Sequence, residues 1–138
     1  MNNLVFTLKV KPRTKKNHMQ LVTLKTGRQM LLPSKQYKEF EKEVIEAVND
    51  LLLHECLKYE DLPISCPINL KCEFYKEKDY KADLMGYLQA IQDALVKAGV
   101  LEDDNHKIVV TTNGSRVYLD RENPRIEIEI DKLQKGDI

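Results

Sequence analysis

Three aspartates bracket one apolar-striped stretch of this sequence in a pattern that could bind a metal ion. Asp83 precedes the stretch, and Asp103 and Asp104 follow it a few residues past its end. Magnesium takes oxygen ligands and keeps several waters, so two or three carboxylates can hold it. In phosphodiester hydrolysis such an ion activates water and neutralises charge on the phosphate. The spacing therefore indicates a candidate site for metal-assisted phosphate chemistry.

A helix over about 83–98 must position these acids. Its apolar stripe recurs at spacings of three and four: Leu84, Leu88, Ile91, Leu95 and Ala98. Such a helix is about 24 Å long, and residues 99–104 could return roughly 20 Å if the chain doubles back after Gly99. The alternative is that Asp83 only caps the helix and that Asp103 and Asp104 lie in a solvated loop.

A basic segment near the N-terminus is the second candidate site. It contains Lys11, Arg13, Lys15, Lys16 and Asn17. Such a segment could position nucleic acid through its phosphates without reading the base sequence, and the alternative is a solvated charged loop. The formal net charge is zero, so any grip on phosphates must be local.

The remaining pattern predicts an α+β fold in a single domain, 1–138. We expect strands over 4–10, 68–75, 107–112, 116–119 and 126–130, and a hairpin of 19–25 with 29–33. A first helix should begin after the N-cap Ser34, run to about Leu57 and bury Tyr37, Phe40, Val44, Val48 and Leu51. Two helices can then cover one face of a mixed or antiparallel sheet.

Composition narrows the class of protein further. No apolar run approaches the roughly 20 residues that span a bilayer, and the N-terminus lacks a signal-peptide pattern. The three cysteines have no zinc-site spacing, so we expect reduced thiols in a cytoplasmic protein without a membrane partner or a small-molecule cofactor. The three histidines are scattered and receive no role.

Taken together, these segments resemble the RusA family of Holliday-junction resolvases, which is common in phages and prophages. The resemblance covers most of the chain. Its segments are Pro12-Arg13-Thr14-Lys15-Lys16-Asn17, Leu32-Pro33-Ser34-Lys35-Gln36-Tyr37, Asp83-Leu84, Asp93-Ala94-Leu95 and Ala98-Gly99-Val100-Leu101-Glu102-Asp103-Asp104-Asn105. The family pattern is an Asp-x-Asp-Asn-x-x-Lys motif, then Asp-Ala-Leu, a short link with glycine and an Asp-Asp pair.

The resemblance implies a homodimer that binds four-way DNA junctions in recombination and repair and, with magnesium, nicks opposing strands. Two-fold symmetry suits a junction with two equivalent phosphates. Asp83 matches the motif's first aspartate, and Asp103 and Asp104 match the later pair, of which Asp104 is the member regarded as essential. These three are the implied catalytic residues and magnesium ligands.

Three positions depart from the family motif. Met85 replaces its second aspartate, Gly86 its asparagine and Gln89 its lysine. One hard oxygen ligand and one cation are therefore missing, and Glu73, Asp79 or Lys81 could substitute for them in space. Gly86 could permit close packing at the helix start, or could let a backbone amide approach a phosphate.

The sequence leaves three functions open. The first is a magnesium-dependent endonuclease that resolves junctions. The second is a weakened or inactive junction-binding protein on the same dimeric scaffold. The third is an interaction protein that binds no DNA, in which 11–17 packs on its own protein and Asp83 lies far from Asp104.

Overall fold

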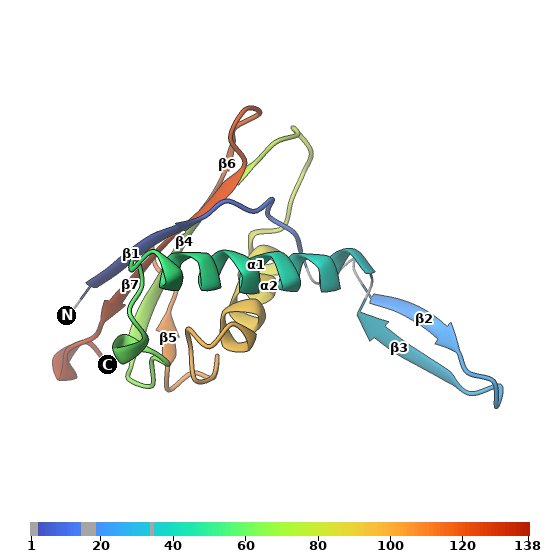
Figure 1. Cartoon of the computed structure of the whole chain (residues 1–138), viewed down its shortest axis with the longest axis horizontal. Helices are drawn as coiled ribbons and strands as arrows, with labels where there is room; N and C mark the ends of the chain where they lie inside the picture. The colour runs from blue at the N-terminus through green and yellow to red at the C-terminus, as the bar shows by residue number, and fades with distance from the viewer. Residues whose placement is uncertain (1–2, 15–18, 34) are drawn as a thin grey trace.

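A five-stranded mixed sheet forms the centre of the computed structural model, which describes residues 3–14, 19–33 and 35–138 (Figure 1). The strand order is β1 (Asn3–Leu8), β7 (Arg125–Lys132), β4 (Ile68–Lys76) and β5 (Val109–Thr111), and β6 (Arg116–Leu119) pairs with the other end of β4. The first two pairings are antiparallel, whereas β5 and β6 run parallel to β4. The predicted mixed sheet is confirmed.

Two helices, α1 (Lys35–Leu53) and α2 (Leu84–Lys97), cover one face of this sheet (Figure 1). Alternate strand residues point towards them and are buried: Phe6, Leu8, Leu70, Cys72, Phe74, Ile126, Ile128 and Ile130. The helices add their apolar stripes to the same core. The α+β architecture with two covering helices follows directly from the two periodicities in the sequence.

The first helix ends earlier than the sequence pattern predicted. α1 stops at Leu53, and Glu55 takes a positive φ of 60°. The amide of Cys56 then donates to the carbonyl of Leu51 at 2.8 Å. Leu52 is buried and Leu51 is only half-buried, so the last core-facing residue of α1 is Leu52 and not the predicted Leu51. The predicted N-cap, Ser34, lies outside the described residues.

The hairpin is present but does not join the main sheet. β2 (Met19–Thr23) and β3 (Gln29–Pro33) pair with each other as a separate two-stranded sheet. Gly27, with φ 81°, supplies the left-handed residue of the connecting turn. The hairpin projects away from the body at the end of the molecule where α1 begins (Figure 1).

The sheet face opposite the helices carries a row of charged and aromatic side chains. The Arg125 guanidinium lies 3.8 Å from the Tyr75 ring centre, and Tyr75 stacks on Tyr118 at 4.9 Å. Arg125 also donates to Asp120 at 2.9 Å and to Glu127 at 2.7 Å. These contacts give the face a polar and aromatic surface.

Two short 3₁₀ turns lie outside the main helices and strands. A 3₁₀ turn, η1 (Tyr59–Asp61), follows α1, and another, η2 (Lys135–Asp137), lies near the C-terminus. All three cysteines are free thiols, with Cys72 buried and Cys56 exposed. Among the described residues, no helix combines the length and the apolar character needed to cross a membrane.

Candidate functional site

Asp83 is the N-cap of α2. Its backbone is extended, and its Oδ1 accepts a hydrogen bond from the amide of Met85 at 3.1 Å. Aspartate is favoured at this position because its carboxylate satisfies a helix amide and lies at the positive end of the helix dipole. The side chain is exposed, so the cap also presents a carboxylate oxygen to solvent.

The described part of the basic segment packs against the same end of α2. An added Cβ on Gly86 would lie 3.1 Å from Thr14 Cβ and 3.3 Å from its Cγ2. Burial raises the pKa of Tyr87 and the charge of Arg13 opposes part of that rise, so Arg13 also lies near this helix turn. The glycine therefore serves close packing, the first of the two roles considered for it.

A cavity of about 260 Å³ opens beside this contact. Its lining comes from the segment after β1, the last residue of β4 and the segment that follows β4: Lys11, Pro12, Arg13, Lys76, Glu77, Lys78 and Tyr80. Four of these seven residues are cationic and one is acidic, so the cavity favours an anion. We call it the cation-lined cavity.

The buried Lys76 side chain holds one wall of this cavity in place through hydrogen bonds. Only 8% of the residue is exposed, and its Nζ donates to the carbonyls of Lys78 at 3.0 Å and Tyr80 at 2.8 Å. Lys11 pairs with Glu77 at 3.0 Å. Lys76 thus holds the segment after β4, and the exposed Arg13 and Lys78 are left to meet a ligand.

The acidic pair lies past the other end of α2. After Gly99 the chain pairs with the segment at Ile64, whose amide donates a hydrogen bond to the carbonyl of Val100 at 2.9 Å. The Asp103 carboxylate accepts from Asn105 Nδ2 at 2.9 Å and from the amide of Asp104 at 2.8 Å. These bonds lower the pKa of Asp103, so its ionised side chain orders its own loop.

Asp104 meets a carboxylate that the sequence analysis did not select. Burial, followed by the hydrogen bond and charge of Asp93, raises the pKa of Asp104. Two carboxylates this close favour a shared proton or a bound cation. Asp93 belongs to the Asp-Ala-Leu segment of the resemblance, and this was the signal that could have identified it.

Tyr37 of α1 lies near this acid pair. Burial and then the charge of Glu41 raise the pKa of Tyr37, with smaller contributions from Asp93 and Asp104. Glu41 is buried and forms an ion pair with Lys97 at 2.7 Å. We call Tyr37, Glu41, Asp93, Lys97 and Asp104 the interhelix cluster.

The two ends of α2 therefore hold different acids. Ten residues separate Asp83 from Asp93, which corresponds to about 15 Å along a helix axis. In the described parts of the chain, no three Asp, Glu, His or Cys side chains are close enough together to hold a metal ion. The structure thus joins Asp104 with Asp93, and places Asp83 beside the basic segment.

The residues that could replace the missing motif groups lie apart from the acid pair or on the protein surface. Met85 is 67% exposed beside Asp83. Glu73 pairs with Lys71 at 3.9 Å on the sheet face away from the helices, so it cannot replace the missing ligand. Asp79 lies 3.9 Å from Lys76, and Lys81 is exposed. Lys15, Lys16 and Asn17 lie outside the described residues.

An exposed carboxylate beside a cation-lined cavity, on a small α+β fold, is suited to a protein that handles phosphates. The family model for endodeoxyribonuclease RusA matches residues 8–131. The chain therefore belongs to the RusA endodeoxyribonuclease family, whose members act on branched DNA junctions and generally depend on a divalent metal ion. No curated protein matches the chain.

The interhelix cluster offers a minimal donor set for such an ion. Burial first, and then the hydrogen bond and charge of Asp93, raise the pKa of Asp104, so the two carboxylates lie near each other. Magnesium is commonly bound through one or two carboxylates, with waters and substrate phosphates as the other ligands. Asp93 and Asp104 are therefore a pair of carboxylates of the kind that such an ion can use, and Asp83 lies about 15 Å from Asp93 along the helix axis.

Proposed function

We propose that this protein is a magnesium-dependent, structure-specific endodeoxyribonuclease that resolves four-way DNA junctions in recombination and repair and acts as a homodimer. The observation that carries the proposal is the family match over nearly the whole chain. The geometry adds support, because the cation-lined cavity lies beside Asp83 at the start of the helix that leads to Asp104. The proposed site residues are Asp83, Asp103 and Asp104, to which we add Asp93.

In this proposal Asp93 and Asp104 would hold magnesium, which when bound activates water and offsets charge on the phosphate. Asp103 orders the loop that carries Asp104, through its bonds to Asn105 and to the amide of Asp104. The raised pKa of Asp104 supports this role, because carboxylates with perturbed pKa values are frequent at functional sites.

Arg13 and Lys78 would bind DNA phosphates at the cation-lined cavity, with Lys11, Lys15, Lys16 and Asn17 extending the contact. Asp83 and Asp93 are about 15 Å apart along the axis of α2. This distance corresponds to about four nucleotides, at 3.4 Å of duplex axis per phosphate on one strand. A strand anchored at the cavity would thus present a phosphate roughly four nucleotides away to Asp104.

The test is a cleavage assay on a synthetic four-way junction with magnesium. Asp93→Asn and Asp104→Asn should each abolish cleavage and leave junction binding in place. Glu102→Gln, in the same loop and exposed, is the matched control and should cut normally. Normal cleavage by Asp104→Asn would refute the proposed metal site.

A non-catalytic junction-binding protein is the second candidate. The observations that favour it are Met85 and Gln89 in the motif, and the absence of a three-acid group among the described residues. Under this candidate, Arg13→Ala and Lys78→Ala weaken junction binding and each lowers the salt slope by about one. Lys42→Ala, on the exposed side of α1, is the control. Binding without cleavage at any magnesium concentration would favour this candidate.

A further inference from the structure

One face of the projecting hairpin, residues 19–33, is apolar and only partly covered by the described residues. Opposite residues in the β2–β3 pair share a face, and Val22 lies opposite Met30. Leu24 and Leu32 continue that face, with Leu24 38% exposed and Met30 42% exposed. A two-stranded hairpin is at best marginally stable alone in water, so a surface that covered this face would stabilise the hairpin.

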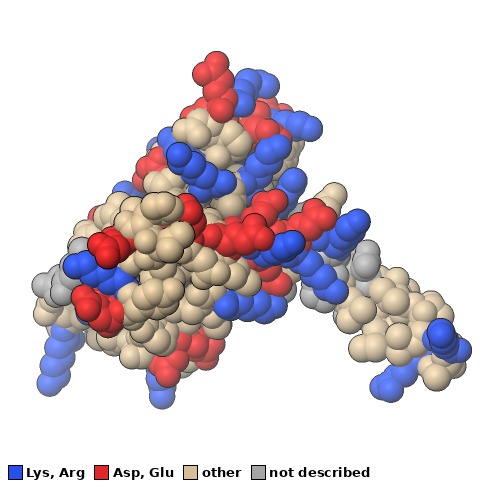
Figure 2. Space-filling model, viewed as in Figure 1, with Lys and Arg blue, Asp and Glu red and all other residues tan. Residues whose placement is uncertain are grey.

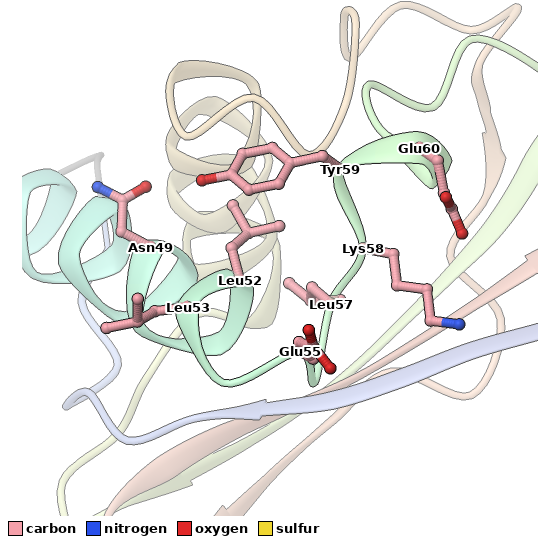
Figure 3. Close-up of a pocket in the computed structure, with 8 residues that line it drawn as sticks. All are labelled: Asn49, Leu52, Leu53, Glu55, Leu57, Lys58, Tyr59 and Glu60. Atoms are coloured by element: carbon pink, nitrogen blue, oxygen red, sulfur yellow. The ribbon is translucent and has the colours of Figure 1, made fainter.

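A groove lined by apolar and charged side chains lies at the other end of α1. It is a cavity of about 760 Å³ lined by Asn49, Leu52, Leu53, Glu55, Leu57, Lys58, Tyr59 and Glu60. Figure 3 shows that these side chains come from the last turn of α1 and from the segment that follows it. Leu53 is 76% exposed and Tyr59 75% exposed. Large apolar side chains this exposed indicate an interaction surface.

The two surfaces have opposite charge. The hairpin contains Lys25 and Arg28 and no acidic residue, and Figure 2 shows the basic side chains at its outer end. The groove and the small hollow next to it carry three acids, Glu55, Glu60 and Asp61, against one cation, Lys58. Such complementarity steers association and fixes the orientation of the partners.

Their positions exclude contact within one chain but suit contact between two. The hairpin projects from the N-terminal end of α1, and the groove lies at its C-terminal end (Figure 1). α1 has 19 residues, or about 28 Å. One arm of the hairpin, residues 19–26, spans about 26 Å when extended. A hairpin that begins beside the N-terminal end of a partner's α1 therefore reaches the groove at its C-terminal end.

We propose that two copies of this chain exchange their hairpins, each hairpin placing its apolar face, Val22, Leu24, Met30 and Leu32, in the other copy's groove. The exchange is two-fold symmetric, so both hairpins and both grooves are used and association stops at the dimer. This proposal gives an interface to the homodimer of the proposed function. It requires neither DNA nor cleavage, so either proposal can fail without the other.

A cysteine cross-link tests the contact directly. Cys56 is exposed and lines the hollow beside the groove, and Leu24 lies at the hairpin turn. Under mild oxidation, Leu24→Cys should form an intermolecular disulfide with Cys56 and run at about twice the 16.1 kDa of one chain on a non-reducing gel. The same substitution with Cys56→Ser should lose that product, and Leu119→Cys, exposed on β6, should not form it. No Cys56-dependent product would overturn the proposal.

Sedimentation provides the second measurement. The wild-type chain should sediment as a dimer without DNA or magnesium. Met30→Asp and Leu53→Asp should each raise the dimer dissociation constant at least tenfold, whereas Leu119→Asp should not change it. A wild-type monomer, or a dimer unaffected by both substitutions, would overturn the proposal. So would a Met30→Asp variant that loses junction binding while its mass stays dimeric, because the hairpin would then be a DNA contact.

Discussion

Gly86 tests the contact between the basic segment and the start of α2. Gly86→Ala places a methyl group 3.1 Å from Thr14 Cβ and 3.3 Å from its Cγ2, closer than ordinary van der Waals contact. Alanine in a helix is worth about 1 kcal/mol over glycine, whereas overpacking costs about 1–3 kcal/mol. The net result should be a loss of about 0–2 kcal/mol in the free energy of unfolding.

Thr14→Gly removes both atoms that the new methyl group would meet. In that background Gly86→Ala should stabilise the protein by about 1 kcal/mol, which makes the coupling between the two positions about 1–3 kcal/mol. Urea denaturation of the four proteins measures this coupling. Gly136→Ala has no neighbour within 4 Å and should show no coupling to Thr14→Gly.

Gly86→Ala alone should also weaken junction binding. The added methyl group displaces Thr14, and this moves Arg13 away from the start of α2. A coupling below about 0.5 kcal/mol is what independent sites show. That result would mean that the segment does not pack on the helix, and the proposed phosphate contact beside Asp83 would lose its structural basis.

The remaining predictions concern charged groups and stability. Lys97→Met leaves Glu41 buried without its cation. Because Lys97 is 57% exposed, we expect the free energy of unfolding, measured by urea denaturation, to fall by about 1 kcal/mol. Adding Glu41→Gln to the same protein should restore it. In magnesium-free buffer Asp104→Asn should raise the melting temperature at pH 7 but not at pH 3; the raised pKa of Asp104 means that its ionisation opposes folding as pH rises. The Arg125 guanidinium lowers the pKa of Asp120, so the ionised carboxylate stabilises the fold above about pH 4 and this contribution is lost on acidification. Asp120→Asn should therefore reduce the fall of the melting temperature at acid pH. An unchanged fall would contradict a stabilising pair of Asp120 with Arg125.

Much of the fold could be predicted because its signals are local. Alternation along 68–75 and 126–130 predicted β4 and β7, and a spacing of three and four predicted α2. Parallel pairing of β4 with β5 and β6 has no such signal, since it depends on where the chain returns after α2. The separate position of the hairpin likewise depends on tertiary contacts that the strand pattern does not contain.

The site was only partly predictable for the same reason. The sequence predicted a site with Asp83 and Asp104, and spacing allowed them to meet if the chain doubled back after Gly99. Instead the chain hydrogen-bonds with Ile64, which directs Asp104 to Asp93. Lys76 was not selected either, because its place in an alternating strand does not reveal that its amine turns to the carbonyls of the next segment.

The central claim is magnesium-dependent resolution of branched DNA by a site that includes Asp104. A synthetic four-way junction with labelled strands, incubated with the wild-type protein and with Asp104→Asn, with and without magnesium, tests it most directly. We predict paired nicks on opposing strands with the wild-type protein and magnesium, and none without the metal or with the variant. Binding without cleavage by the wild-type protein at every magnesium and manganese concentration would contradict the claim.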